Sequence, residues 1–158
     1  MGQEVSMHVV LATLIALVLG AIGFGGGIYE TVLVDRVWPR KPQLIQPSRG
    51  GIRRALFWGP VQVLYEFALL VAAWVVWDIA VARWWIVAAL VAHFTARAWS
   101  FMYFIPTALR FEKLNDLTPE QVREAWQWVR LSRFRPVLEG ASLIAQSVAI
   151  AHLTVRPL

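Results

Sequence analysis

The stretch AHFTARAWSF, residues 92–101, lies inside an apolar run that extends from residue 84 to 106. A run of this length is long enough to cross a hydrocarbon core of about 30 Å as a helix. It nevertheless carries His93 and Arg97 one helical turn apart. An arginine at the centre of a membrane helix costs roughly 2.5–3.5 kcal/mol even on the most lenient insertion scale. The sequence therefore predicts a buried partner for Arg97.

Three more apolar runs, at residues 8–34, 55–77 and 137–156, accompany this one. The chain has 58% apolar and 16% charged residues, whereas soluble domains have roughly 45–50% and 25%. Because the chain is short and shows four runs, we expect one domain, residues 1–158, folded as an all-α integral membrane four-helix bundle. The chain has no cysteine, which excludes disulfides, thiolate nucleophiles and cysteine-ligated metals.

The two longer connections differ in sequence. Residues 37–51, VWPRKPQLIQPSRGG, contain three prolines and a glycine pair and predict an irregular segment. In the second connection Thr118, Pro119 and Gln121 form a helix start with a capping box. Apolar residues recur there at helical spacing opposite charged ones, so we expect a short amphipathic helix over residues 119–134 that lies on the membrane surface.

The basic residues are concentrated in these two connections. Twelve of the fifteen Lys and Arg residues occur there: Arg36, Arg40, Lys41, Arg49, Arg53, Arg54, Arg110, Lys113, Arg123, Arg130, Arg133 and Arg135. The opposite side has only Arg83 and Arg156. The positive-inside rule then places both basic loops in the cytoplasm and both termini outside, most simply in a bacterial inner membrane. Since these arginines flank spans, their expected partner is the lipid bilayer and not nucleic acid.

Tryptophans cluster near both ends of the spans. Trp74, Trp77, Trp84 and Trp85 lie at the outer ends, and Trp38, Trp58, Trp126 and Trp128 lie near the inner ones. This distribution is typical of interfacial anchors.

Polar residues within the runs fall at similar depth and follow helical spacing. Glu66, His93, Arg97 and Gln146 come from three spans near one level, and Glu30, Gln62, Ser100, Glu139 and Ser142 lie nearer the inner face. We predict that Glu66 pairs with Arg97. The three glutamates exceed the one permanent cation, so the group is suited to holding protons or a cation. A polar network that fixes helix register is the structural alternative.

The same residues offer ligands for a metal ion. His93 and Glu66, with Glu30 or Glu139, would supply nitrogen and oxygen ligands, but no paired E-x-x-H or H-E-x-x-H spacing occurs. A metal site therefore stays an alternative, and the sequence leaves the cofactor undetermined. Both His8 and His152 fall near the outer face, where histidines need no special role.

Three glycines of the first run, Gly20, Gly23 and Gly27, lie on the same arc as Glu30. Small residues at this spacing typically let a neighbouring helix approach closely. Alternatively, the missing side chains leave room for a ligand beside Tyr29 and Glu30. Both interpretations can hold together.

Nearly the whole chain resembles a known family. The segments GGGIYETVLVDRVWP (25–39), FMYFIPTALRFEKLND (101–116) and REAWQWVRLSRFRPVLEGASLIAQSVAI (123–150) are similar to the anthrone oxygenase-like group of small four-helix membrane proteins. The resemblance implies oxidation of anthrones to anthraquinones in polyketide pathways without a bound organic cofactor. Its matching positions are Tyr29, Glu30, Pro106, Trp126 and Arg135.

Together these features predict a membrane oxidoreductase, of the monooxygenase type that the resemblance implies, acting on an aromatic, lipid-soluble substrate in a polar cavity within the bundle. His93 or Glu66 would remove a proton and Arg97 would stabilise the resulting oxyanion. Substrate contacts are expected from Tyr29, Glu30, Ser100 and Gln146. Two alternatives stay open: an accessory subunit that packs against partner membrane subunits, and a small transporter or proton path.

Overall fold

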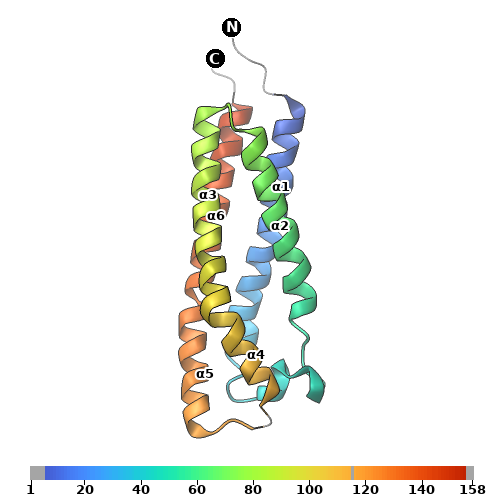
Figure 1. Ribbon diagram of the computed structural model, residues 1–158, viewed down its shortest axis with the longest axis vertical. Helices are drawn as coiled ribbons and strands as arrows, with labels where there is room; N and C mark the ends of the chain where they lie inside the picture. The colour runs from blue at the N-terminus through green and yellow to red at the C-terminus, as the bar shows by residue number, and fades with distance from the viewer. Residues whose placement is uncertain (1–5, 115, 156–158) are drawn as a thin grey trace.

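The computed structural model describes residues 6–114 and 116–155, and Arg156 lies outside them. The described part of the chain forms four long antiparallel helical rods, with both chain ends at the same end of the bundle (Figure 1). The first rod is α1 (Met7–Tyr29), which continues into a π-helical turn at Glu30–Val34. The second is α2 (Ala55–Val75). All four rods are long and apolar enough to cross a membrane.

The third and fourth rods are each built from two helices. α3 (Ala80–Trp99) passes through a π-helical turn at Ser100–Phe104 into α4 (Ile105–Lys113), and α4 leaves the line of α3 (Figure 1). α5 (Pro119–Ser132) is followed after one residue by α6 (Phe134–Thr154). The four expected spans are thus confirmed as helices, with ends shifted by a few residues.

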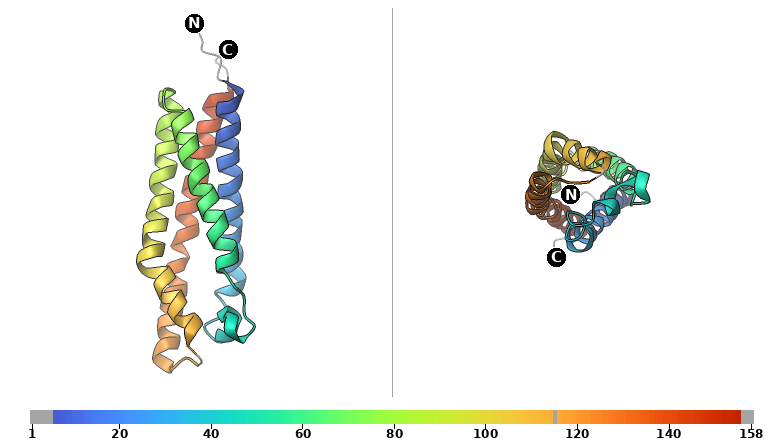
Figure 2. Two further views of the ribbon diagram at one scale, coloured as in Figure 1. Left: turned by 45° about the vertical axis from the view of Figure 1, so that its right-hand side comes forward. Right: turned by 90° about the horizontal axis from the view of Figure 1, so that it is seen from below.

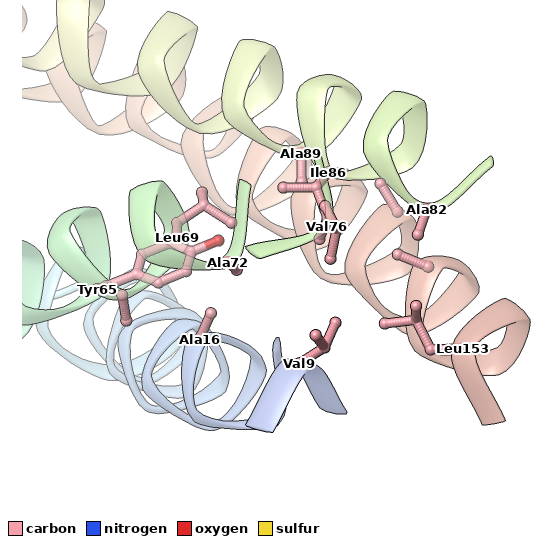
Figure 3. Packing of buried hydrophobic residues seen from close by; sticks show 13 residues of the cluster. Val9, Ala16, Tyr65, Leu69, Ala72, Val76, Ala82, Ile86, Ala89 and Leu153 are labelled. Atoms are coloured by element: carbon pink, nitrogen blue, oxygen red, sulfur yellow. The ribbon is translucent and has the colours of Figure 1, made fainter. Parts of the chain in front are cut away.

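The end of the bundle that carries the chain termini has a core of small residues. Ala16, Ala72, Ala82, Ala89 and Ala149 are fully buried there, and Figure 3 shows several of these side chains between the helices. Small side chains let helix backbones approach closely in a membrane protein. The closest packing joins α6 to α3 and to α1, and α1 to α2, whereas α2 and α3 touch less.

The other end of the bundle has an aromatic core made by Trp38, Phe104, Phe111 and Trp128, with Ile45 from the connection. The rings of Trp38 and Trp128 meet edge to face with centroids 5.7 Å apart, and the Trp128 indole donates a hydrogen bond to the Phe104 carbonyl at 3.1 Å. The prediction of interfacial anchors was therefore wrong for these two tryptophans, which are buried. Trp74, Trp77 and Trp84 at the opposite end are exposed, as an interfacial position requires.

The helix after Thr118 forms as predicted, including its capping box between Thr118 and Gln121. Its expected orientation was wrong. A helix lying on a membrane surface would cross the bundle axis, but α5 extends along the line of α6 (Figures 1 and 2). The reason is packing: Ala125, Trp128 and Val129 on its apolar face enter the aromatic core instead of facing lipid.

The connection over residues 35–54 is irregular, as its prolines predicted, with two short 3₁₀ turns at Pro42–Ile45 and Pro47–Arg49. It is nevertheless anchored. The buried Gln46 amide donates to the carbonyls of Phe111 and Leu114, and the Asp35 carboxylate accepts hydrogen bonds from Trp38 Nε1 at 3.2 Å and Ser132 Oγ at 2.9 Å. These contacts hold the connection against α4 and α5 at the loop end of the bundle.

Candidate functional site

A cavity of about 360 Å³ lies in the half of the bundle that carries the aromatic core. Its wall combines aromatic rings with ionisable groups from three of the rods and from Arg54, the residue before α2. The aromatic lining residues are Phe24, Trp58, Phe101, Phe104 and Trp128, and the charged ones are Glu30, Arg54, Arg97, Glu112, Arg135 and Glu139. This composition suits an aromatic ligand that also carries polar atoms.

The predicted partner of Arg97 is confirmed. Arg97 Nε donates to Glu66 Oε1 at 2.6 Å, and both side chains are largely buried. Such contact offsets the cost of placing an arginine within an apolar span. The Arg97 guanidinium also lies over the Phe101 ring, 4.5 Å from its centroid.

His93 connects this pair to Glu139 of α6. His93 Nδ1 is 2.9 Å from Glu139 Oε2, and His93 Nε2 is 3.7 Å from Glu66 Oε1. The imidazole is fully buried, and its Nε2 has no hydrogen-bond partner among the described residues. A histidine between two carboxylates can hold a proton on either nitrogen, so the group Glu139, His93, Glu66 and Arg97 forms a connected ionisable chain.

Only two of these four ionisable residues reach the cavity. Glu139 and Arg97 line it, whereas His93 and Glu66 lie behind them and do not. Of the three residues predicted to be catalytic, therefore, only Arg97 faces the space that a ligand can occupy. Glu139, which the sequence grouped with the polar stripe, is the acid of this group of four that faces the cavity.

Gln146 belongs to a separate network, contrary to the expectation that it contacts substrate. Its Nε2 donates to Tyr65 Oη at 2.8 Å, and Tyr65 Oη is 2.8 Å from Ser142 Oγ. Ser142 donates in turn to the Ala89 carbonyl at 3.0 Å. This buried group adjoins His93 through Tyr65, whose ring centroid is 4.5 Å from that of the imidazole. It joins α2, α3 and α6 and does not line the cavity.

Of the other three residues expected to contact substrate, two line the cavity and one does not. Glu30 and Ser100 line the cavity, although the Ser100 hydroxyl donates to the Ala96 carbonyl within its own helix. Tyr29 does not line it and is 58% exposed on the outside of the bundle. Glu30 and Thr31 face the cavity, and Tyr29, about 100° of helix rotation before Glu30, lies on the outer side of that arc.

Sequence reasoning missed Arg54, Glu112 and the role of Arg135. Arg54 bridges two acids, with Glu30 at 3.2 Å and Glu112 at 2.9 Å, and Glu30 also accepts from Trp58 Nε1 at 2.9 Å. Arg54 was counted only as a loop charge, and Arg135 as a loop charge and a matching position of the resemblance without a role. The signal was present: Arg54, Trp58 and Gln62 continue the polar stripe of α2 at four-residue spacing, and Arg135 stands one turn before Glu139.

The glycine stripe packs closely at one position and lines the cavity at another. A Cβ atom on Gly20 would lie 2.9 Å from atoms of Tyr65 and Leu143, so this glycine is required for close helix packing. A Cβ atom on Gly27 would lie no closer than 3.8 Å to Pro136 or Trp58, and Gly27 lines the cavity. Gly27 therefore leaves room instead of allowing contact.

The cavity reaches the outside of the bundle between α2 and the segment formed by the second π-helical turn and α4. Its lining residues Ala55 and Gly59 on one side, and Phe101 and Leu109 on the other, are exposed. Ala55, Gly59 and Phe101 belong to the parts of these helices that are apolar enough to cross a membrane, and Leu109 follows in α4. The opening thus lies on the outer side of two long helices.

No group of three or more histidines and acids in the described part of the chain is arranged to hold a metal ion. The geometry explains why, because Glu66 and Glu139 approach opposite nitrogens of His93 and their oxygens cannot converge on one point. Glu30 is occupied by Arg54 and Trp58.

Comparisons of the chain with models of known protein families, with curated proteins and with solved structures find no match. They assign the chain to no family. Its function is therefore argued from the cavity and from the residues that line it.

Proposed function

We propose that the protein is an integral membrane oxygenase that oxidises an anthrone-type aromatic substrate within this cavity. One observation carries the proposal: Glu139 faces an aromatic-lined cavity and is backed by His93, Glu66 and Arg97. A carboxylate at a cavity wall with a histidine behind it can take a proton from a bound ligand and share it with a second base. The family resemblance supplies the reaction type.

In the proposed reaction Glu139 removes a proton from the activated methylene carbon of the substrate. The carbanion transfers electrons to molecular oxygen and forms a carbon–oxygen bond, which gives a hydroperoxide. Loss of water then leaves a ketone, so that one methylene and one oxygen molecule become one carbonyl and one water. The proton taken by Glu139 returns in the water. Arg97, which also lines the cavity, supplies positive charge near the developing anion.

The opening between α2 and α4 supports entry of the substrate from the bilayer. It lies within apolar spans, and the exposed Phe101 stands at its edge. A lipid-soluble aromatic compound partitions into the hydrocarbon region. It would then reach the cavity without passing through water.

Two alternatives receive less support from the packing. A path for ions or protons across the bundle would need polar groups at the terminal end. Among the described residues the only buried polar side chain beyond Gln146 on that side is Thr13, whose hydroxyl donates to the carbonyls of Val9 and Val10. An accessory subunit has no need of an unfilled cavity with ionisable walls.

We also infer that the loop end of the bundle is cytoplasmic, because the basic residues gather there. A reporter inserted near Gln46 should behave as cytoplasmic, and one fused after Leu158 as extracytoplasmic. The opposite pattern would reverse the orientation without affecting the site.

Turnover by purified protein in lipid nanodiscs tests the proposed reaction. With an anthrone and oxygen, Glu139→Gln should lower the rate roughly 10²- to 10⁴-fold, the usual contribution of a general base. Glu120→Gln, at an exposed position outside the cavity, is the matched control and should keep the parent rate. A parent protein that consumes no oxygen with any anthrone would exclude the oxygenase function.

His93 acts in this scheme as a positioning residue, because it contacts Glu139 and not the cavity. His93→Gln should therefore lower turnover less than Glu139→Gln does, and it should displace the pH profile of kcat, which a purely structural defect would not. His8→Gln and His152→Gln, both exposed, should leave rate and profile unchanged. If His93→Gln abolishes turnover while Glu139→Gln does not, His93 is the base, as the sequence first suggested.

A further inference from the structure

Arg135 is a cation in the cavity wall without an acidic partner in contact. It lies in the first turn of α6, lines the cavity, and makes no hydrogen bond or ion pair with any described residue. Its Nε is buried and has no hydrogen-bond acceptor. Its guanidinium carbon lies 4.4 Å from the ring centroid of Phe104 and 5.3 Å from that of Trp128. A buried donor without an acceptor is costly, so this group calls for a ligand.

The acids whose charges act on Arg135 are Glu30, Asp35 and Glu139, and each is occupied elsewhere. Glu30 accepts from Arg54 and Trp58, one on each oxygen. Asp35 accepts from Trp38 and Ser132, again one on each oxygen. Glu139 holds His93. Arg54 and Arg97, in contrast, each contact a carboxylate directly.

The aromatic rings limit how Arg135 can be satisfied. They lie against the guanidinium, which leaves its N–H edge as the place for a hydrogen bond. A planar guanidinium donates best in its own plane, to an oxygen that carries negative charge. Arg135 and Glu139 stand one helical turn apart, about 5–6 Å between Cβ atoms, and both line the cavity. One aromatic ligand can therefore meet both residues.

We propose that Arg135 binds the ligand oxygen that becomes anionic, so that the substrate class is a fused aromatic ketone or phenol whose oxygen ionises as enolate or phenolate. This inference rests on the proposed function, in which Glu139 takes a proton from the same ligand. The ligand ring lies among the other aromatic rings of the wall, Phe24, Trp58 and Phe101, its oxygen meets the Arg135 N–H edge, and its acidic carbon faces Glu139. Arg135 thereby favours the ionised form of whatever ligand the cavity holds.

A coloured product-type probe tests the inference without any turnover. Alizarin, 1,2-dihydroxyanthraquinone, changes its absorbance when a phenol ionises. Bound to the parent in nanodiscs, with empty nanodiscs as the blank, it should ionise more readily than when bound to Arg135→Gln, by roughly 10- to 1,000-fold in the ionisation constant, the effect of an opposite charge within a few ångströms. Arg135→Lys should restore part of the effect. Arg130→Gln, exposed and outside the cavity, is the control and should match the parent.

A second probe guards against loss of fold. The dimethyl ether of alizarin cannot ionise, so it should quench tryptophan fluorescence equally in the parent and in Arg135→Gln. If the ether binds both proteins and alizarin ionises equally in both, the neighbouring acids neutralise Arg135 and the inference is overturned. If neither probe binds the parent, it is overturned as well. Ionisation that depends on Arg135, in a protein that oxidises no anthrone, would support the anion site and exclude only the oxygenase.

Discussion

The two halves of the bundle use the same four rods in opposite ways. At the terminal end, alanines bring the helices together and nearly every buried group is apolar. At the loop end, the core is largely tryptophan and phenylalanine, and arginines and glutamates line a cavity beside it. The difference shows how a short chain can hold a polar site. Close packing in the terminal half holds the four rods together, so the rods can lie farther apart around a cavity in the loop half.

The change between the halves coincides with the two π-helical turns, at Glu30–Val34 and Ser100–Phe104. Wide turns of this kind interrupt regular α-helical hydrogen bonding, redirect the helix and occur often at functional sites. Both begin at a residue that lines the cavity. The second lies where α4 departs from the line of α3 (Figure 1).

The largest effect should come from breaking the ion pair at the boundary between the halves. Glu66→Gln leaves Arg97 buried beside a neutral group, which should lower the free energy of unfolding by roughly 3 kcal/mol. The same change in an Arg97→Met background should cost much less, because no cation is stranded. Denaturant titration of the four proteins in detergent measures this double-mutant cycle. Additive losses would show that the contact contributes nothing.

This pair also shows what the sequence could predict. An arginine in an apolar run needs an acid beside it. Glu66 could be predicted as that acid because only a few acids lie at the same depth. The same reasoning could not predict whether His93 or Glu139 faces the cavity. His93 and Glu139 are both on inward stripes, and only the packing of α3 against α6 decides that the imidazole is covered while the carboxylate is open.

Enlarging a buried side chain should lower the stability of the protein more in the terminal half than in the loop half. Ala89 is fully buried between α3 and α6, and its carbonyl accepts from Ser142. Ala89→Leu should destabilise the protein by roughly 2 kcal/mol, because the added atoms force neighbouring side chains and backbone apart. Val91→Leu, on the exposed face of the same helix, is the control. Equal stability of both variants would mean that the alanine core is loose.

A smaller and pH-dependent effect is expected in the loop half. Burial raises the pKa of Asp35 to about 6, with a further contribution from the charge of Glu30. Between the usual pKa of 3.8 and about 6 the folded protein keeps a proton that the unfolded chain has lost. The free energy of unfolding should therefore fall as pH rises through this window, by at most about 1.4 kcal/mol per pH unit, and level off above it.

The variant that checks this is Asp35→Asn, which mimics the protonated acid and can still accept a hydrogen bond from Trp38 or Ser132. The difference between parent and variant should change between pH 4 and 6 and be constant above pH 7. The matched control is Asp116→Asn, whose side chain is almost fully exposed. A flat difference curve for Asp35→Asn would show that its carboxyl ionises normally.

The loop half is also where sequence reasoning failed most. Tryptophans near span ends are usually interfacial, but Trp38 and Trp128 are buried because α5 continues along α6 and packs its Trp128 against Trp38 and Phe104. Arginines near span ends usually mark topology, but Arg54 and Arg135 point into the cavity. Both errors have one cause. The residues next to a position in the sequence do not reveal that the helix bundle extends beyond the apolar runs.

The smallest effect on stability, and the sharpest contrast between inside and outside, should come from two glycines of one helix. Gly27 lines the cavity and has room for a side chain, whereas Gly25 is exposed and has no atom within 4 Å of an added Cβ. Replacing either by leucine should stabilise the helix by about 0.5–1 kcal/mol, because glycine loses more backbone freedom on folding.

Binding should separate these two variants. The leucine at position 27 would extend into the cavity beside Trp58 and compete with an aromatic ligand. Gly27→Leu should therefore weaken binding of the dimethyl ether of alizarin at least tenfold, as measured by quenching of tryptophan fluorescence. The leucine at position 25 would lie outside the bundle and leave binding as in the parent. Because both variants gain the same helix stability, a difference in binding cannot come from the fold. Equal binding by both would mean that the ligand occupies a surface other than this cavity, and the terminal and loop halves would then differ in packing alone.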